Sequence, residues 1–289
     1  MKTNMLIIGA GRSGTTTLYE HLKSHPDICF SNAKEVPYFS IPDIYKRGES
    51  YYHSFFKPNN QKIIASSDTY LLIDKDAPKR ISDYNPDMKI IIMLREPVER
   101  SYSSYVYAIN NGHEKKTITF RDSYNNEKEN IANPDIIKKN NFGHFYTGLY
   151  HKHVKYWMQF FPKENFLLIK TQDLKKDYNE VLIKVSKFLN IREIKSEIKI
   201  KTNEASGAKF MFLHKFLINR NSKLRKVLAK MFPNSLKEIV FNSGIIEKIN
   251  KLNKKQTLYK PISKEDSVFV KNYFKEDLQL LKDELDITF

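Results

Sequence analysis

Short apolar runs recur along the chain, and each one ends in polar or turn-forming residues. They lie at 5–8, 62–65, 88–94 and 165–170, with a weaker one at 28–32. Continuous apolar runs of this length are typical of strands that are buried on both faces. Segments with helical periodicity alternate with them, at 76–84, 98–110, 147–160, 173–189 and 264–285. This alternation indicates βαβ units, so we predict an α/β fold with a central parallel sheet flanked by helices.

Two stretches interrupt the alternation. Residues 111–145 are polar, rich in Asn and Lys and poorly periodic, which is typical of an insertion or a mobile loop. Residues 208–255 are basic and mostly helical in pattern. That pattern fits a packed helical segment with a charged outer face, or a basic amphipathic helix in peripheral contact with an anionic membrane. We expect residues 1–289 to form a single domain that contains both stretches.

The charge is strongly positive. Lys and Arg number 49 against 33 Asp and Glu, which gives a net charge of +16. Such a field attracts nucleic acid, anionic polysaccharide, an anionic membrane or a multiply charged nucleotide. A coding bias toward Lys, Asn and Ile explains the excess equally well. Because zinc-finger spacing, basic-zipper and aromatic RNA-binding signatures are missing from the sequence, we expect no nucleic-acid partner.

Cysteine usage and the N-terminus bear on location. Cys29 is the only cysteine, so no intrachain disulfide can form, which suits a reducing compartment. The N-terminus lacks signal-peptide features, and no run approaches the roughly 20 apolar residues of a membrane span. We therefore expect a cytoplasmic protein. Nothing in the sequence specifies an oligomeric state.

A glycine-rich turn, Gly9-Ala10-Gly11-Arg12-Ser13-Gly14-Thr15-Thr16, joins the first apolar run to a predicted helix. Backbone N–H groups and the positive end of a helix dipole make such a turn suitable for phosphate or sulfate. The glycine spacing satisfies the dinucleotide fingerprint, but the acidic residue expected about 20 residues later is replaced by Ser31 and Asn32. It also has the spacing of an NTPase phosphate loop, with Thr15 in place of the lysine. A third interpretation is a phosphate loop whose cation is Arg12.

A second motif follows the run at 88–94. Arg95 comes directly after this predicted strand, Pro97 suits the first turn of a helix, and Ser103 lies about two turns further on. Arg95 offers a planar fork that suits phosphate. The alternative is a surface ion pair of Arg95 with Glu96 or Glu99. Both motifs are expected at the carboxyl edge of the sheet, where open α/β sheets bind ligands.

Taken together these motifs resemble the carbohydrate sulfotransferases that use 3′-phosphoadenosine 5′-phosphosulfate, in particular the heparan-sulfate branch and its bacterial relatives. The segment 11–18 resembles the family's phosphosulfate loop, and 94–103 its 3′-phosphate motif. Residues 34–39, Lys-Glu-Val-Pro-Tyr-Phe, resemble the segment that carries the catalytic Glu. Matches at 149–162 and 261–274 follow in the family's order.

The resemblance implies an enzyme that moves a sulfuryl group to a hydroxyl or amine of a carbohydrate or glycolipid by in-line displacement. Glu35 would be the general base, and Arg12 would stabilise charge during transfer. The residues implied to hold the donor, or its product adenosine 3′,5′-bisphosphate, are Gly11, Arg12, Ser13, Gly14, Thr15, Thr16, Arg95, Ser103 and Lys209. No metal is implied. Tyr38 and Phe39 would wall an acceptor pocket, and 111–145 would border the acceptor cleft.

The sequence also departs from the family. Ala65 and Ser66 stand where its third strand often carries an active-site Lys, and Asp68 is one candidate replacement. Glu35 has a simpler interpretation as a surface carboxylate paired with Lys34. The fallback bases are His25, which looks more like a helix-end residue, and His53. Two other classes stay open, namely a non-catalytic binder of nucleotide or polysaccharide on the same fold, and a P-loop kinase or NTPase.

Overall fold

The computed structural model describes residues 2–193, 206–208, 254–256 and 261–289. Lys209 and nearly all of the basic stretch at 208–255 lie outside the described residues. The chain divides into two compact units. The larger comprises Met1–Ser104, Phe120–Ile200 and Ile262–Phe289, and the smaller comprises Tyr105–Thr119 and Lys201–Pro261. All residues of the candidate site discussed below, except Lys209, belong to the larger unit.

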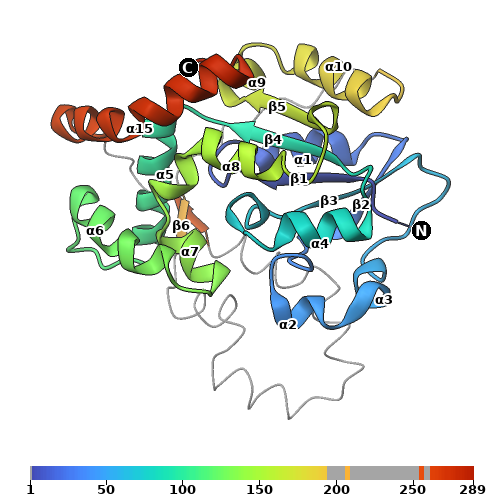
Figure 1. Ribbon diagram of the computed structural model, residues 1–289, viewed down its shortest axis with the longest axis horizontal. Helices are drawn as coiled ribbons and strands as arrows, with labels where there is room; N and C mark the ends of the chain where they lie inside the picture. Colours follow the sequence, from blue (N-terminus) through green and yellow to red (C-terminus); the bar gives the residue numbers. More distant parts are fainter. Residues whose placement is uncertain (1, 194–205, 209–253, 257–260) are drawn as a thin grey trace, which may run out of the picture. The chain divides into compact units, whose positions relative to one another are not determined.

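The larger unit is built on a five-stranded parallel sheet with strand order β2-β3-β1-β4-β5 (Figure 1). The strands are β1 (Met5–Gly9), β2 (Ile28–Glu35), β3 (Ile63–Ser67), β4 (Lys89–Leu94) and β5 (Phe166–Lys170). Met5 of the central strand is paired with Ala65 on one side and with Lys89 on the other. All the predicted strands are present, and the predicted fold class is confirmed.

Helices fill the connections between the strands. Around the first three strands they are α1 (Thr15–Lys23), α2 (Pro42–Tyr45), α3 (Gly48–His53) and α4 (Ala77–Tyr84). After β4 come α5 (Pro97–Asn110), α6 (Phe120–Ile131), α7 (Ile136–Phe142) and α8 (Tyr150–Trp157). After β5 come α9 (Thr171–Lys176), α10 (Tyr178–Leu189) and α15 (Lys264–Leu285). Short 3₁₀ turns, η1 to η3, lie at Leu71–Ile73, Tyr146–Gly148 and Lys163–Asn165.

Helices cover both faces of the sheet, which explains why its strands are apolar without alternation. Met5 and Ile7 pack on one face with buried residues of α1, α9 and α10. Leu6 and Ile8 pack on the other face with buried residues of α4 and α8, among them Trp157. With both faces covered, the open ends of the strands are the part of the sheet that is left for a ligand.

Residues 111–145 contain regular structure that the sequence pattern did not predict. Helices α6 and α7 lie in this segment, so of the two alternatives the mobile loop is wrong there, while the insertion stays a prediction. The buried carboxyl group of Glu127 on α6 accepts hydrogen bonds from the backbone N–H groups of Phe145 and Tyr146, each 2.6 Å long. The ring of Phe120 stacks on that of Phe145 with centroids 5.0 Å apart. These long-range contacts hold helices whose own periodicity is weak.

The other predicted helices are present with small changes. The helix predicted at 173–189 is divided into α9 and α10 at Asp177, whose side chain accepts from the N–H of Glu180 and so caps α10. The predicted helix at 264–285 is α15, capped by Ser263. Within the smaller unit, β6 (Ser206–Ala208) and β7 (Lys254–Gln256) form an antiparallel pair. No helix among the described residues is long and apolar enough to cross a membrane.

Candidate functional site

The glycine-rich turn between β1 and α1 has the form of an anion-binding loop. Gly14 immediately precedes α1 with φ 89°, a left-handed conformation that glycine adopts without steric cost. Arg12 has φ 71°, which is unusual for a residue with a side chain. The first N–H groups of a helix have no acceptor within the helix. The N-terminus of α1 therefore presents donors and a positive dipole at the end of the central strand.

The loop is fixed by contacts from the neighbouring strands. The N–H of Ala10 donates to the carbonyl of Met93 on β4 at 2.8 Å. The hydroxyl of Thr171, at the start of α9, lies 2.6 Å from the carbonyl oxygen of Ser13 and 3.0 Å from that of Leu94. Thr171 therefore ties the loop to the end of β4, where the second motif begins.

Arg95 lies at the end of β4, as predicted, and α5 begins at Pro97. The carboxylate of Glu96 accepts from the N–H of Glu99 at 2.8 Å and thereby caps the helix. The buried hydroxyl of Tyr150 donates to the carbonyl of Arg95 at 2.9 Å. These contacts fix the backbone from which the Arg95 guanidinium extends.

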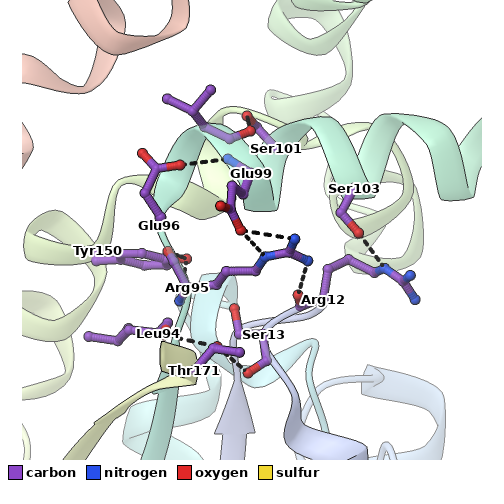
Figure 2. Close-up of polar contacts among 11 residues, drawn as sticks. Arg12, Ser13, Leu94, Arg95, Glu96, Glu99, Ser101, Ser103, Tyr150 and Thr171 are labelled. Atoms are coloured by element: carbon purple, nitrogen blue, oxygen red, sulfur yellow. Dashed lines mark hydrogen bonds and ion pairs between the residues drawn. The ribbon is translucent and has the colours of Figure 1, made fainter. Parts of the chain in front are cut away.

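The two motifs meet at this edge of the sheet (Figure 2). Nε of Arg12 donates to Oγ of Ser103 over 3.4 Å, and Nη1 of Arg95 lies 3.5 Å from the carbonyl oxygen of Arg12. Ser103 is buried on α5, whereas Arg12 is exposed. Residues more than 80 positions apart thus form one cluster of two guanidinium groups and a hydroxyl, next to the N-terminus of α1. This composition suits phosphate and sulfate groups.

Arg95 also forms an ion pair with Glu99, one of the two surface pairs that the sequence offered as an alternative. Both Nε and Nη2 lie 3.1 Å from Oε2 of Glu99, one helical turn further along (Figure 2). The Glu99 side chain is 58% exposed, so solvent screens this pair strongly. An anion of higher charge can compete with a screened carboxylate for the same guanidinium.

Glu35 ends β2 and lies opposite Ser67 of β3. Its Oε2 accepts from the N–H of Thr69 at 2.9 Å, and its Oε1 contacts Nζ of Lys34, the predicted surface partner. The side chain is 41% exposed. Glu35 is therefore accessible at the carboxyl edge of the sheet, on the β2–β3 side, while Arg12, Arg95 and Ser103 gather around β1 and β4.

The other candidate bases are more enclosed. Burial and the negative charge of Glu35 raise the pKa of the fully buried Asp68 to about 7. His53 shares a hydrogen bond with the hydroxyl of Tyr84 at 2.9 Å, and burial lowers its pKa. His25 follows the end of α1, as predicted, and its Nε2 lies 2.9 Å from the carbonyl oxygen of Arg192.

Tyr38 and Phe39 do not wall a pocket. Each is only 2% exposed, and they belong to a packed aromatic cluster. The ring of Tyr38 stacks on Tyr52 with centroids 4.7 Å apart, and Phe39 meets Tyr84 edge-on at 5.2 Å. Because apolar packing buries both rings in the core, they cannot wall the predicted acceptor pocket.

Sequence reasoning missed three residues that shape this edge, namely Tyr150, Thr171 and Thr69. Thr171 follows directly after β5, a position that marks it as a residue of the carboxyl edge. Thr69 acts through its backbone, which no side-chain pattern reveals.

Among the described residues, no cluster of His, Cys, Asp and Glu could hold a metal ion.

Comparison with known proteins identifies the family to which this chain belongs. The family model described as "Sulfotransferase domain" matches residues 2–269. The chain therefore belongs to the sulfotransferase domain family. The resemblance that was drawn from the two phosphate motifs is confirmed at that level.

Individual relatives are consistent with this assignment. The mouse heparan sulfate glucosamine 3-O-sulfotransferase 5 is 30% identical over 205 residues, which cover 70% of this chain and 57% of the relative. The human bifunctional heparan sulfate N-deacetylase/N-sulfotransferase 3 is 29% identical over 64% of this chain and 22% of the relative. The matched parts thus span little more than half of one relative and less than a quarter of the other. A sulfotransferase structure from Alicyclobacillus acidocaldarius covers 100% of this chain and 98% of its own, with 20% identity and a TM-score of 0.70, so it shares the fold.

Proposed function

We propose that the protein transfers the sulfuryl group of 3′-phosphoadenosine 5′-phosphosulfate to a hydroxyl or amine of a carbohydrate acceptor. The observation that carries the proposal is the meeting of Arg12, Arg95 and Ser103 beside the N-terminus of α1. It occurs in a chain of the sulfotransferase domain family. The donor has phosphate at both the 3′ and 5′ positions, and the cluster provides a separate cation for each end.

The residues divide the work by position. The N–H groups at the start of α1, with the hydroxyls of Thr15 and Thr16, would bind the 5′-phosphate. Arg95 and Ser103 would bind the 3′-phosphate, the guanidinium by charge and the hydroxyl by donation. The bound donor supplies an activated sulfuryl group. Arg12 would stabilise the charge that shifts to the leaving phosphate during transfer.

Glu35 would accept the proton of the acceptor group. Its carboxylate is accessible, and the N–H of Thr69 fixes one of its oxygens. Proton removal by a positioned carboxylate is general base catalysis. It makes the attacking oxygen or nitrogen more nucleophilic as the sulfur–oxygen bond to the leaving phosphate breaks. Lys209, implied by the resemblance to close over the nucleotide, stays a prediction because it lies outside the described residues.

A glycan acceptor is supported by the relatives, whose names specify heparan sulfate as the substrate of an O-sulfotransferase and of an N-sulfotransferase. The net charge of +16 suits an acidic polysaccharide. A glycolipid acceptor and contact with an anionic membrane stay predictions, as does a cytoplasmic location. A kinase or NTPase is disfavoured because Thr15 occupies the place of the phosphate-loop lysine.

The donor assignment is tested by calorimetry with adenosine 3′,5′-bisphosphate and AMP. We expect the bisphosphate to bind more tightly, because Arg95 and Ser103 address the extra phosphate. Arg95→Ala should weaken its binding roughly 10- to 150-fold, equivalent to about 1.5–3 kcal/mol, and leave AMP unaffected. Arg47→Ala, which removes an exposed cation stacked on Tyr51, is the control. An unchanged preference in Arg95→Ala would overturn the donor assignment.

Transfer itself is tested with the ³⁵S-labelled donor and a panel of glycans that includes heparan sulfate and its desulfated form. Incorporation of label into a glycan supports the proposal. Tight binding of the bisphosphate without transfer to any glycan or glycolipid would favour a non-catalytic binder instead. Turnover of ATP that requires Mg²⁺ would favour the kinase or NTPase alternative.

A further inference from the structure

Asp68 is a buried acid that the proposed mechanism does not use. It follows directly after β3 and is 2% exposed. Its Oδ2 accepts from the hydroxyl of Ser40 at 2.6 Å, and its Oδ1 accepts from the N–H of Tyr70 at 3.0 Å. Its own N–H donates to the carbonyl of Ile7 on β1 at 3.0 Å. The carboxyl group is thus fixed by a hydroxyl and an amide, while its backbone is fixed to the central strand.

The turn that Asp68 begins also holds Glu35. The N–H of Thr69 donates to Oε2 of Glu35 at 2.9 Å, and the next N–H, that of Tyr70, donates to Asp68. Consecutive amides of one turn therefore serve two carboxylates. This pairing is possible because Glu35 lies opposite Ser67, the residue just before Asp68. The orientation of Glu35 consequently depends on a turn that the Asp68 side chain closes.

We propose that Asp68 is a positioning residue for Glu35. It fixes the turn whose amide orients the Glu35 carboxylate, and its negative charge favours movement of the acceptor's proton onto Glu35. This inference rests on the proposed function, since it assigns Asp68 a role in the same transfer step. Asp68 directly follows β3, the strand that lacks the active-site Lys often found in the family. This site therefore has a buried acid where those relatives have a nearby positive charge.

The charge effect follows from the groups around Asp68. Glu35 on β2 and Asp74 after η1 are acidic, Ser40 donates a hydrogen bond, and Tyr52 on α3 is neutral in its environment. Lys34 contacts the far oxygen of Glu35. Burial and the Glu35 charge raise the pKa of Asp68 to about 7, although the hydrogen bond from Ser40 opposes this rise. Near neutral pH Asp68 therefore loses its proton and places a second negative charge beside Glu35. This charge attracts the proton of the acceptor group toward the Glu35 carboxylate more strongly.

The first test is the pH profile of sulfate transfer by Asp68→Asn with the labelled donor and heparan sulfate, or another panel glycan that the wild type sulfates. The wild-type rate should rise with pH through about 7 as Asp68 loses its proton. Asn retains an acceptor for Tyr70 and removes the charge. We expect this rising limb to disappear and the rate at pH 8 to fall roughly tenfold, less than the 10²-fold or more that loss of a general base costs. Affinity for adenosine 3′,5′-bisphosphate should not change.

The second test is Ser40→Ala, which removes the hydroxyl that stabilises the charged form of Asp68. The rising limb should move upward by about one pH unit, because a hydrogen bond to a charged group is typically of that size. Carbon-13 NMR of the Asp68 carboxyl group should show the same upward shift in its titration. Ser40→Ala decides the matter if Asp68→Asn does not fold.

Asp277→Asn is the matched control. Asp277 is a buried aspartate on α15 that accepts from the N–H groups of His151 and Lys152 at 3.0 and 3.1 Å. Its replacement should lower stability and leave the pH profile unchanged. A wild-type profile in Asp68→Asn, or an unmoved limb in Ser40→Ala, would overturn the role of Asp68 alone. A wild-type chain that transfers no sulfate overturns the proposed function as well.

Discussion

Charged residues of the proposed site form ion pairs with neighbouring residues of opposite charge. Arg95 extends toward the 3′-phosphate position that we propose, yet it is paired with Glu99 and touches the carbonyl of Arg12. Glu35 is likewise paired with Lys34. Both simple surface pairs anticipated from the sequence are present. They are compatible with function because both are partly exposed, and such pairs typically contribute only about 0–1 kcal/mol.

Removing the charge of Glu99 should strengthen donor binding. Glu99→Gln frees the Arg95 guanidinium from a competing carboxylate and removes repulsion of the 3′-phosphate. We expect affinity for adenosine 3′,5′-bisphosphate to rise roughly 2- to 10-fold, a modest gain because the carboxylate is exposed. AMP, which has no 3′-phosphate, should bind as before. Calorimetry with both nucleotides gives the comparison, and weaker binding of the bisphosphate would mean that Glu99 holds Arg95 in its binding orientation.

Replacing the proposed general base Glu35 should slow sulfate transfer without changing the affinity for the nucleotide. Glu35→Gln retains an oxygen for the N–H of Thr69 and cannot accept a proton. We expect the transfer rate to fall about 10²-fold or more, the usual scale for a general base, while bisphosphate affinity is unchanged. Both quantities are measured on one preparation. Lys34→Ala, which breaks the surface pair and leaves the carboxylate, is the control. Near wild-type transfer by Glu35→Gln would move the search for the base to His53 or Asp68.

At the scale of helices and strands, sequence patterns were informative where burial is local and continuous. The apolar runs predicted every strand of the parallel sheet, and Pro97 marked the start of α5. The patterns failed at α6 and α7, since these helices are held by contacts distant in sequence, such as Glu127 with Phe145. They also failed at Tyr38 and Phe39, because periodicity cannot say whether a ring faces a pocket or the core.

Helix α6 should therefore depend on the buried carboxyl group of Glu127. In Glu127→Gln the side-chain NH₂ group, a donor, faces one of the two backbone N–H groups that now donate to the Glu127 oxygens. Burial raises the pKa of Glu127 to about 8, so the group is largely neutral at pH 7. We expect the free energy of unfolding to fall by about 1–3 kcal/mol, the usual cost of a buried N–H without an acceptor, measured by urea denaturation at pH 7. Glu129→Gln makes the same change at an exposed position of α6 and should have little effect. Equal stability of the two variants would mean that other contacts hold α6.

For the whole molecule, the fold class was predictable from the alternation of apolar runs with helical segments, and the family from two phosphate motifs in a fixed order. The shared place of the two motifs at the carboxyl edge was also predictable, but the single contacts between them, such as Arg12 with Ser103, were not. Acid stability is a property of the molecule that only the structure reveals. His153 of α8 is buried, its Nε2–H donates to the backbone carbonyl of Tyr146 at 2.8 Å, and burial lowers its pKa to about 4.

Stability should consequently fall as the pH drops from about 6.5 to 4. In this window an unfolded His, with a pKa of about 6.5, binds a proton that the folded His153 does not, so acid favours unfolding. The contribution is about 3 kcal/mol at the lower end. Thermal or urea unfolding at several pH values, compared between wild type and His153→Gln, measures it. An identical pH dependence in the variant would show that His153 does not cause the loss.

The bond from Arg12 to Ser103 has a consequence for how the protein discriminates between donors. A serine hydroxyl can accept from Arg12 and at the same time donate its own proton to a 3′-phosphate. The hydrogen bonds from Arg12 to Ser103 and from Ser103 to the 3′-phosphate would then connect the 5′ and 3′ ends of the nucleotide. Each hydrogen bond would polarise the next. A donor without the 3′-phosphate leaves Arg12 with a less polarised partner at the moment of transfer. Selectivity would then appear in turnover as well as in affinity, so an analogue that saturates the protein could still be a poor substrate.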